Sequence, residues 1–150
     1  MRFFTDEKYQ NGSAFTEYES YCKSIWPQVP IGLRQISKDM LPSEFDSDMV
    51  YGLHDARIIK FECDEQANEI FIYFSIFDEE DNEYRLKGTY KDAKCILQPS
   101  VTFIGDDRDC DIMCHEVIYE KKRFSHTILF ASGEELIIEF STFELEVMKQ

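Results

Sequence analysis

Two adjacent residues, His54 and Asp55, carry the side chains that general acid–base catalysis uses. An imidazole exchanges protons near neutral pH, and a neighbouring carboxylate can orient it. The pair stands directly before a predicted strand, where consecutive side chains point to opposite sides, so Asp55 should not orient His54. No Gly-x-Ser-x-Gly nucleophile motif accompanies them. We therefore expect no catalytic site, with Asp55 capping a turn and His54 at the sheet edge; an enzyme centred on this pair stays an alternative.

A second group of residues has the chemistry of a zinc site. Cys110, Cys114 and His115 follow one another closely, and His126 stands on the next predicted strand. A hairpin would bring His115 and His126 near each other. Structural zinc sites usually combine closely spaced cysteine pairs, however, whereas Cys114 and His115 should face opposite sides of a strand. We expect neither a metal ion nor a cofactor, and interpret Cys114 as a core or edge thiol.

Two acidic runs provide the candidate binding residues. Asp107, Asp109 and Asp111 alternate as calcium ligands do, but an EF-hand would need Gly and Glu where the chain has Ile112 and Ile118. Both runs are predicted to be solvated turns, and their carboxylates are available to a partner. The candidate binding residues are Asp78, Glu79, Glu80, Asp81, Asp106, Asp107, Asp109 and Asp111.

Aromatic residues are unusually frequent, at 15% of the chain. Many of them gather around Phe71, Tyr73, Phe77, Tyr84 and Tyr90. If a curved sheet encloses space, these side chains would line an apolar ligand cavity, and a filled core explains them equally well. A small-ligand-binding meander or barrel is therefore an alternative function.

Three short helices are predicted before residue 52. Helical spacing indicates helices at about 5–10, 15–25 and 32–41, with Thr5 and Ser13 as predicted caps of the first two. Asn11-Gly12-Ser13 breaks the first helix, and prolines end the other two. The segment 43–52 is polar and acidic and is predicted to be a loop.

Beyond residue 52, apolar residues occur at every second position, which is typical of β-strands. The turns between the strands are short and so should join antiparallel neighbours. Residues 70–77 are apolar on both faces, so this strand should be central, with the helices covering one face. We predict an α+β fold in one domain, with a helical region at 1–50 packed on a strongly curved or barrel-like antiparallel β-meander at 51–150. Its strands are expected at about 59–63, 70–77, 84–91, 94–104, 112–121, 124–131, 135–141 and 143–148.

The charge of the chain limits its partners. Its 30 acidic and 16 basic residues give a net charge of −14, which is distributed along the whole chain. An acidic body repels phosphate backbones and anionic membranes, so we expect neither nucleic acid nor a membrane as a partner, whereas a basic protein would be attracted. Edge strands rich in Glu and Lys resist uncontrolled pairing, which favours a monomer and leaves a dimer open.

The opening residues and the cysteines indicate a cytoplasmic protein. The start becomes charged too early for a signal peptide, and no apolar run approaches the roughly 18 residues of a membrane span. The five cysteines are odd in number and irregularly spaced, which is typical of free thiols in a reducing compartment.

Two stretches of the chain resemble a known group of proteins. Met1-Arg2-Phe3-Phe4-Thr5, then a helical region, then Leu53-His54-Asp55-Ala56-Arg57-Ile58 entering a β-meander, is similar to small bacterial proteins grouped as domains of unknown function. Some similar acidic α+β proteins serve as immunity proteins in toxin systems. The resemblance implies a bacterial cytoplasmic protein and transfers no catalytic residue. Together with the charge, it leads us to expect a non-catalytic protein-binding domain, such as an immunity protein that neutralises a basic toxin through the acidic loops.

Overall fold

The first two helices lie close to their predicted positions, with a side-chain cap on the first, whereas the second follows Gly12 without one. In the computed structural model, which describes residues 1–148, α1 (Asp6–Gln10) follows Thr5, whose hydroxyl accepts the Lys8 N–H. α2 (Ser13–Ile25) and the short η1 (Trp26–Gln28) come next, and these positions confirm the first two predicted helices.

The third helix, α3 (Ile31–Gln35), ends earlier than the predicted 32–41. The Gln35 carbonyl accepts the N–H groups of Val50 and Tyr51, so the following loop satisfies the end of the helix in place of another helical turn. Met40 was predicted to lie in this helix. It belongs instead to the loop that follows α3, and its side chain is buried.

Eight strands follow, and η2 (Arg108–Cys110) precedes the fifth. Their number confirms the prediction, although the fourth ends at Leu97 and not near residue 104. The strands are β1 (Arg57–Asp64), β2 (Glu69–Phe77), β3 (Glu83–Lys91), β4 (Lys94–Leu97), β5 (Ile112–Glu120), β6 (Arg123–Phe130), β7 (Glu135–Phe140) and β8 (Thr142–Met148).

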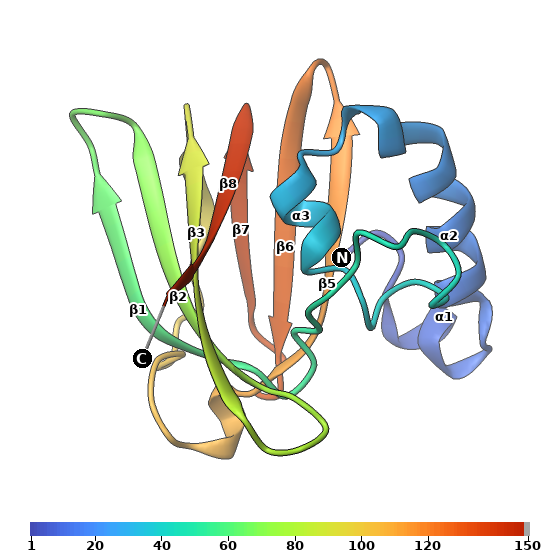
Figure 1. The fold of residues 1–150 in the computed structure, drawn as a ribbon, viewed down its shortest axis with the longest axis horizontal. Helices are drawn as coiled ribbons and strands as arrows, with labels where there is room; N and C mark the ends of the chain where they lie inside the picture. The colour runs from blue at the N-terminus through green and yellow to red at the C-terminus, as the bar shows by residue number, and fades with distance from the viewer. Residues whose placement is uncertain (149–150) are drawn as a thin grey trace.

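The strands form two four-stranded antiparallel sheets that face each other (Figure 1). The strand order is β1-β2-β3-β8 in the first sheet and β4-β7-β6-β5 in the second. The chain changes sheets between β3 and β4 and again at Ser141, which alone separates β7 from β8. The α+β class and antiparallel pairing are thus confirmed, but the strands form an open sandwich in place of one continuous meander and do not close into a barrel.

Side chains from both sheets fill the space between them. Phe74 and Leu86 of the first sheet and Phe130 and Ile138 of the second are fully buried there. Tyr90 lies with them, its ring centroid 4.9 Å from that of Phe140. Of the aromatic residues that the sequence offered as a cavity lining, Tyr90 is thus part of this packed core.

β1 differs from its predicted alternation. The pairing with β2 shifts register between Ile58 and Lys60, so Ile58 points into the core and Ile59 is 40% exposed. A β-bulge inserts one extra residue and reverses which side chains face inward, and simple alternation cannot reveal it.

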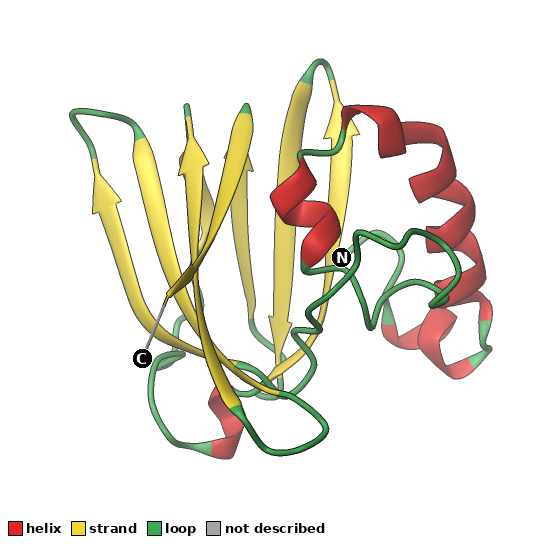
Figure 2. Cartoon of the chain, in the orientation of Figure 1, coloured by secondary structure: helices red, strands yellow, loops and turns green. Residues whose placement is uncertain are grey.

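The helices lie against the second sheet and the β8 edge (Figure 2). Tyr18 and Tyr21 of α2 accept the backbone N–H groups of Val117 and Tyr119 at 2.9 Å, so α2 covers the free edge of β5. The prediction that the helices cover β2 is therefore wrong.

The outer face of β2 is shielded by lysine side chains instead. The Lys87 ammonium lies 4.9 Å from the ring centroid of Phe71, and the Lys60 ammonium lies 5.3 Å from that of Tyr73. Apolar lysine stems can cover aromatic surface while their charged ends stay in water. Both rings are consequently half-buried without a packed helix.

Candidate binding sites

The two predicted acidic loops lie at the same end of the sandwich (Figure 1). The loop before β5 (105–111) lines a cleft of about 570 Å³ with Gly105, Asp106 and Asp111, and the β2–β3 turn (78–83) reaches this cleft through Glu83. We call these two segments, together with Asp55, the acidic end. The side chains that line its cleft include Asp55, Arg57, Ile59, Phe77, Glu83, Arg85, Asp106 and Asp111.

Two arginines in the cleft are paired with carboxylates. Arg57 Nε donates to Asp111 Oδ1 at 2.6 Å and Arg57 Nη1 donates to the Asp106 carbonyl at 2.7 Å, which ties the second loop to β1. Arg85 Nε lies 3.3 Å from Glu83 Oε1, which also accepts the Ser75 hydroxyl at 2.8 Å. The cleft therefore keeps an excess of negative charge after its arginines are neutralised.

The predicted binding residues divide into two groups. Asp78 accepts the N–H groups of Glu80 and Asn82, which lowers the pKa of its carboxyl group, and Asp107 caps η2. These two residues, with Asp111, shape the loops. The carboxylates that point to solvent belong to Glu79, Glu80, Asp81, Asp106 and Asp109.

Apolar side chains are exposed inside this acidic end. Phe77, at the end of β2, is 62% exposed, and Ile59 stands beside the same cleft. Exposed apolar groups with a charged rim are typical of protein–protein contact surfaces. The sequence had marked Phe77 only as one of the aromatics that would line an enclosed ligand cavity, and it had placed Ile59 on a predicted strand without assigning it a binding role.

His54 is held at the sheet edge by a backbone carbonyl. Its Nδ1 lies 2.8 Å from the Met113 carbonyl, which only accepts, so Nδ1 carries the proton and Nε2 is the acceptor of the neutral ring. Asp55 adopts φ 66°, and its Oδ2 lies 3.6 Å from His54 Nε2, beyond a hydrogen bond. Asp39 fixes this turn by accepting the N–H groups of Leu53 and His54.

Cys114 lines the same small cavity as His54 but is a poor nucleophile. Burial raises the pKa of its thiol to about 12, so it stays protonated at neutral pH. An acid–base pair without a hydrogen bond, beside an inert thiol, gives no arrangement for covalent catalysis.

The zinc candidates do not converge. Cys114 faces the cluster under the N-terminal helices, His115 faces the sandwich interior, and the Cys110 thiol lies 3.5 Å from the Thr102 carbonyl. Across residues 1–148, no three His, Cys, Asp or Glu side chains are grouped so that they could hold a metal ion.

A chain of three buried polar side chains crosses the core. Tyr90 Oη lies 2.7 Å from His126 Nδ1, and His126 Nε2 lies 3.0 Å from His115 Nδ1. If the Tyr90 hydroxyl donates to His126 Nδ1, then His126 Nε2–H donates to His115 Nδ1. Both bonds are then satisfied with neutral imidazoles. Sequence alternation brings the two histidines together, but the contact with Tyr90 of the other sheet has no local signal.

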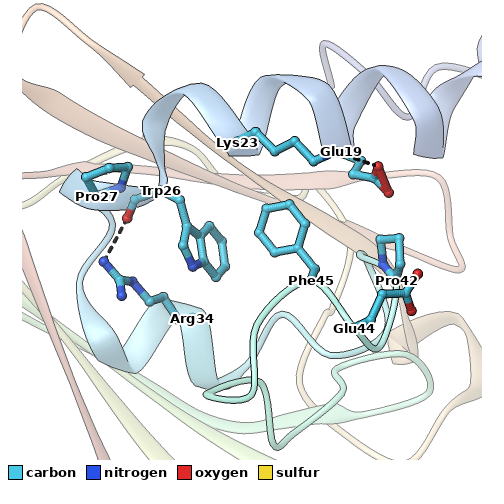
Figure 3. A pocket seen from close by; sticks show the side chains of 8 residues that line it. All are labelled: Glu19, Lys23, Trp26, Pro27, Arg34, Pro42, Glu44 and Phe45. Carbon is cyan, nitrogen blue, oxygen red and sulfur yellow. Dashed lines mark hydrogen bonds and ion pairs between the residues drawn. The ribbon is translucent and has the colours of Figure 1, made fainter.

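A wide groove of about 620 Å³ separates α2 from α3 and the loop after it (Figure 3). The Trp26 and Phe45 rings meet in it at an angle of 86°, with centroids 4.9 Å apart. Its charged groups are already bonded: Lys23 pairs with Glu19, and Arg34 donates to the Trp26 carbonyl at 2.8 Å. These contacts therefore hold α2, α3 and the loop after α3 together.

Comparison with known proteins leaves these sites as the basis for any functional conclusion. The chain matches no protein-family model, no curated protein and no solved structure. Within residues 1–148, no helix combines the length and apolar character that crossing a membrane requires.

Proposed function

We propose that the protein is a non-catalytic protein-binding domain that recognises a basic protein with its acidic end. One observation carries the proposal: both acidic loops lie at the end of the sandwich where Phe77 and Ile59 are exposed beside a cleft that Glu83, Asp106 and Asp111 also line. Surrounding carboxylates would speed the encounter with a basic surface, while the apolar side chains would slow dissociation once buried.

Within this class we propose an immunity protein that neutralises a basic toxin in a bacterial cytoplasm. The support is the net charge of −14 and the resemblance carried by Met1 to Thr5 and Leu53 to Ile58. Such a protein needs no catalytic group, because covering the toxin's functional surface suffices.

Two variants with the same charge change would test the acidic end. The acidic-end variant carries Glu79→Gln, Glu80→Gln and Asp109→Asn, and the matched control carries Glu7→Gln, Glu65→Gln and Glu146→Gln. All six side chains are exposed, and each variant loses three negative charges. Any difference between the variants therefore reports where the charge lies and not how much there is.

The experiment is affinity purification from native lysate at low salt, identification of the partner by mass spectrometry, and measurement of its association rate. We expect a basic partner whose association slows about tenfold or more for the acidic-end variant and much less for the control. Phe77→Ala should raise the dissociation rate by about tenfold. No partner at low salt, or equal effects of both charge variants, would contradict the proposal.

A further inference from the structure

A small cavity beside His54, which we call the His54 cavity, lies between the N-terminal helices and the second sheet. Its volume is about 290 Å³. At roughly 30 Å³ for each non-hydrogen atom, this would hold a ligand of about ten such atoms. The apolar residues of its wall are Phe4, Tyr9, Phe15, Met40, Met113 and Leu129.

Several of these wall residues are exposed around the same cavity. Tyr9 is 59% exposed, and Phe15 and Met113 are 45% exposed. The Phe15 ring lies 5.1 Å from Phe4 and 6.1 Å from Tyr9, centroid to centroid, and so forms an aromatic corner. Exposed apolar groups gathered at one concave site are typical of a ligand site.

The charged groups in the cavity wall are carboxylates. Asp6 and Asp39 line it, and none of the described residues that line it is a lysine or an arginine. The nearby basic residues of the N-terminal region pair elsewhere, Lys8 with Glu17 and Arg2 with Glu120. The cavity thus combines apolar walls with two carboxylates, of which Asp39 also accepts the backbone N–H groups of Leu53 and His54 and Asp6 is exposed.

His54 adds a hydrogen-bond acceptor to this wall. Its Nδ1 donates to the Met113 carbonyl, which leaves Nε2, 3.6 Å from Asp55 Oδ2, as the ring nitrogen that can accept in this tautomer. Asp39 holds the backbone of His54 and Leu53, so the acceptor is fixed before any ligand arrives.

We propose that the His54 cavity binds a small organic cation, namely a primary or methylated amine on an apolar or aromatic body. The ammonium group is complementary to the carboxylates, to the His54 acceptor and to the faces of Tyr9 and Phe15, while the apolar wall buries the body. The His54 cavity and the cleft of the acidic end have no lining residue in common, although His54 stands next to Asp55 of the acidic end. The proposal does not depend on the proposed protein partner.

The test uses three probes that differ only in their polar group. Phenethylamine, 2-phenylethanol and 3-phenylpropionate are titrated into isotope-labelled protein, and amide chemical shifts report both location and affinity. We expect the amine to shift amides around Phe15, His54 and Met113 and to bind about tenfold more tightly than the alcohol, with the carboxylate weakest.

Variants separate the cavity from the general acidity of the protein. Asp6→Asn, an exposed position, should weaken amine binding about threefold to tenfold, whereas Asp106→Asn at the acidic end should change it less than twofold. Removing Asp39 would endanger the fold, so Asp6 carries the test. Equal affinity for the three probes, no shifts at about 20 mM amine, or equal effects of the two variants would overturn the proposal.

Discussion

The buried histidines make a residue-scale prediction about acid stability. Burial lowers the pKa of His126 well below its usual value, and the neighbouring His115 lowers it further. Burial also lowers the pKa of His115, although the negative charge of Asp39 partly opposes that change. The folded core therefore excludes protons that both side chains take up when the chain unfolds.

The sign follows from this difference in bound protons. Above the unfolded-state pKa of about 6.5 both states hold neutral imidazoles, so the stability is complete. Below about pH 6.5 the unfolded state gains protons first, and we expect the free energy of unfolding to fall by up to about 1.4 kcal/mol per pH unit for each histidine. Urea unfolding between pH 7.5 and 5 measures this slope.

His126→Gln tests whether the slope comes from the core. An amide can still bond to Tyr90 and His115 but does not titrate, so the loss of stability between about pH 6.5 and 5 should become shallower. An acid profile that His126→Gln does not alter would show that other groups cause it.

At the scale of elements, one carboxylate attaches the N-terminal segment to the second sheet. Glu116 is buried on β5 and accepts the backbone N–H groups of Arg2, Phe3 and Phe4. The last two bonds measure 3.0 and 3.3 Å. Phe3 and Phe4 in turn pack on Tyr18 of α2, so the carboxylate helps to position the helix that covers the edge of β5.

Glu116→Gln should therefore destabilise the protein by about 2–4 kcal/mol, because one acceptor becomes a donor that faces backbone N–H groups. Glu120→Gln is the matched control: Glu120 pairs with the Arg2 side chain on the surface, where an ion pair contributes about 0–1 kcal/mol. Urea unfolding gives both free energies, and hydrogen exchange at Phe3 and Phe4 shows whether the segment detaches. Similar values for the two variants would argue against this role of Glu116.

At the scale of elements, the positions of the strands could be predicted because the alternation of apolar and polar residues is local. Which strands and side chains pack against each other could not be predicted, because that depends on distant segments. The pattern of residues 70–77 correctly marks an internal strand, yet it does not reveal that lysines from β1 and β3 shield its outer face. The bulge at Ile58 and the early end of α3 also depend on contacts with other segments.

The candidate sites follow the same division. The acidic loops were identifiable from composition, because runs of carboxylates are solvated wherever they occur. Their convergence on one cleft with Phe77 depends on how β2 and the loop before β5 are placed in three dimensions. The residues that line the His54 cavity lie as far apart in the chain as Phe4 and Leu129. No spacing pattern in a single sequence relates residues so distant from one another.

At the scale of the whole molecule, the placement of charge predicts where stability is lost. A net charge of −14 opposes compaction, and the repulsion is strongest where carboxylates crowd together, as in segments 78–83 and 105–111. If the acidic end exists to meet a partner, its carboxylates are retained despite this repulsion.

The acidic-end variant should then be more stable than wild type by about 0.5–1 kcal/mol at low ionic strength, and the matched control should gain less. Near 1 M salt, where the screening length falls to about 3 Å, the difference between the variants should vanish. Urea unfolding of the three proteins at both salt concentrations measures this. A larger gain for the control variant, or a gap that persists in salt, would mean that the acidic end carries no unusual repulsion.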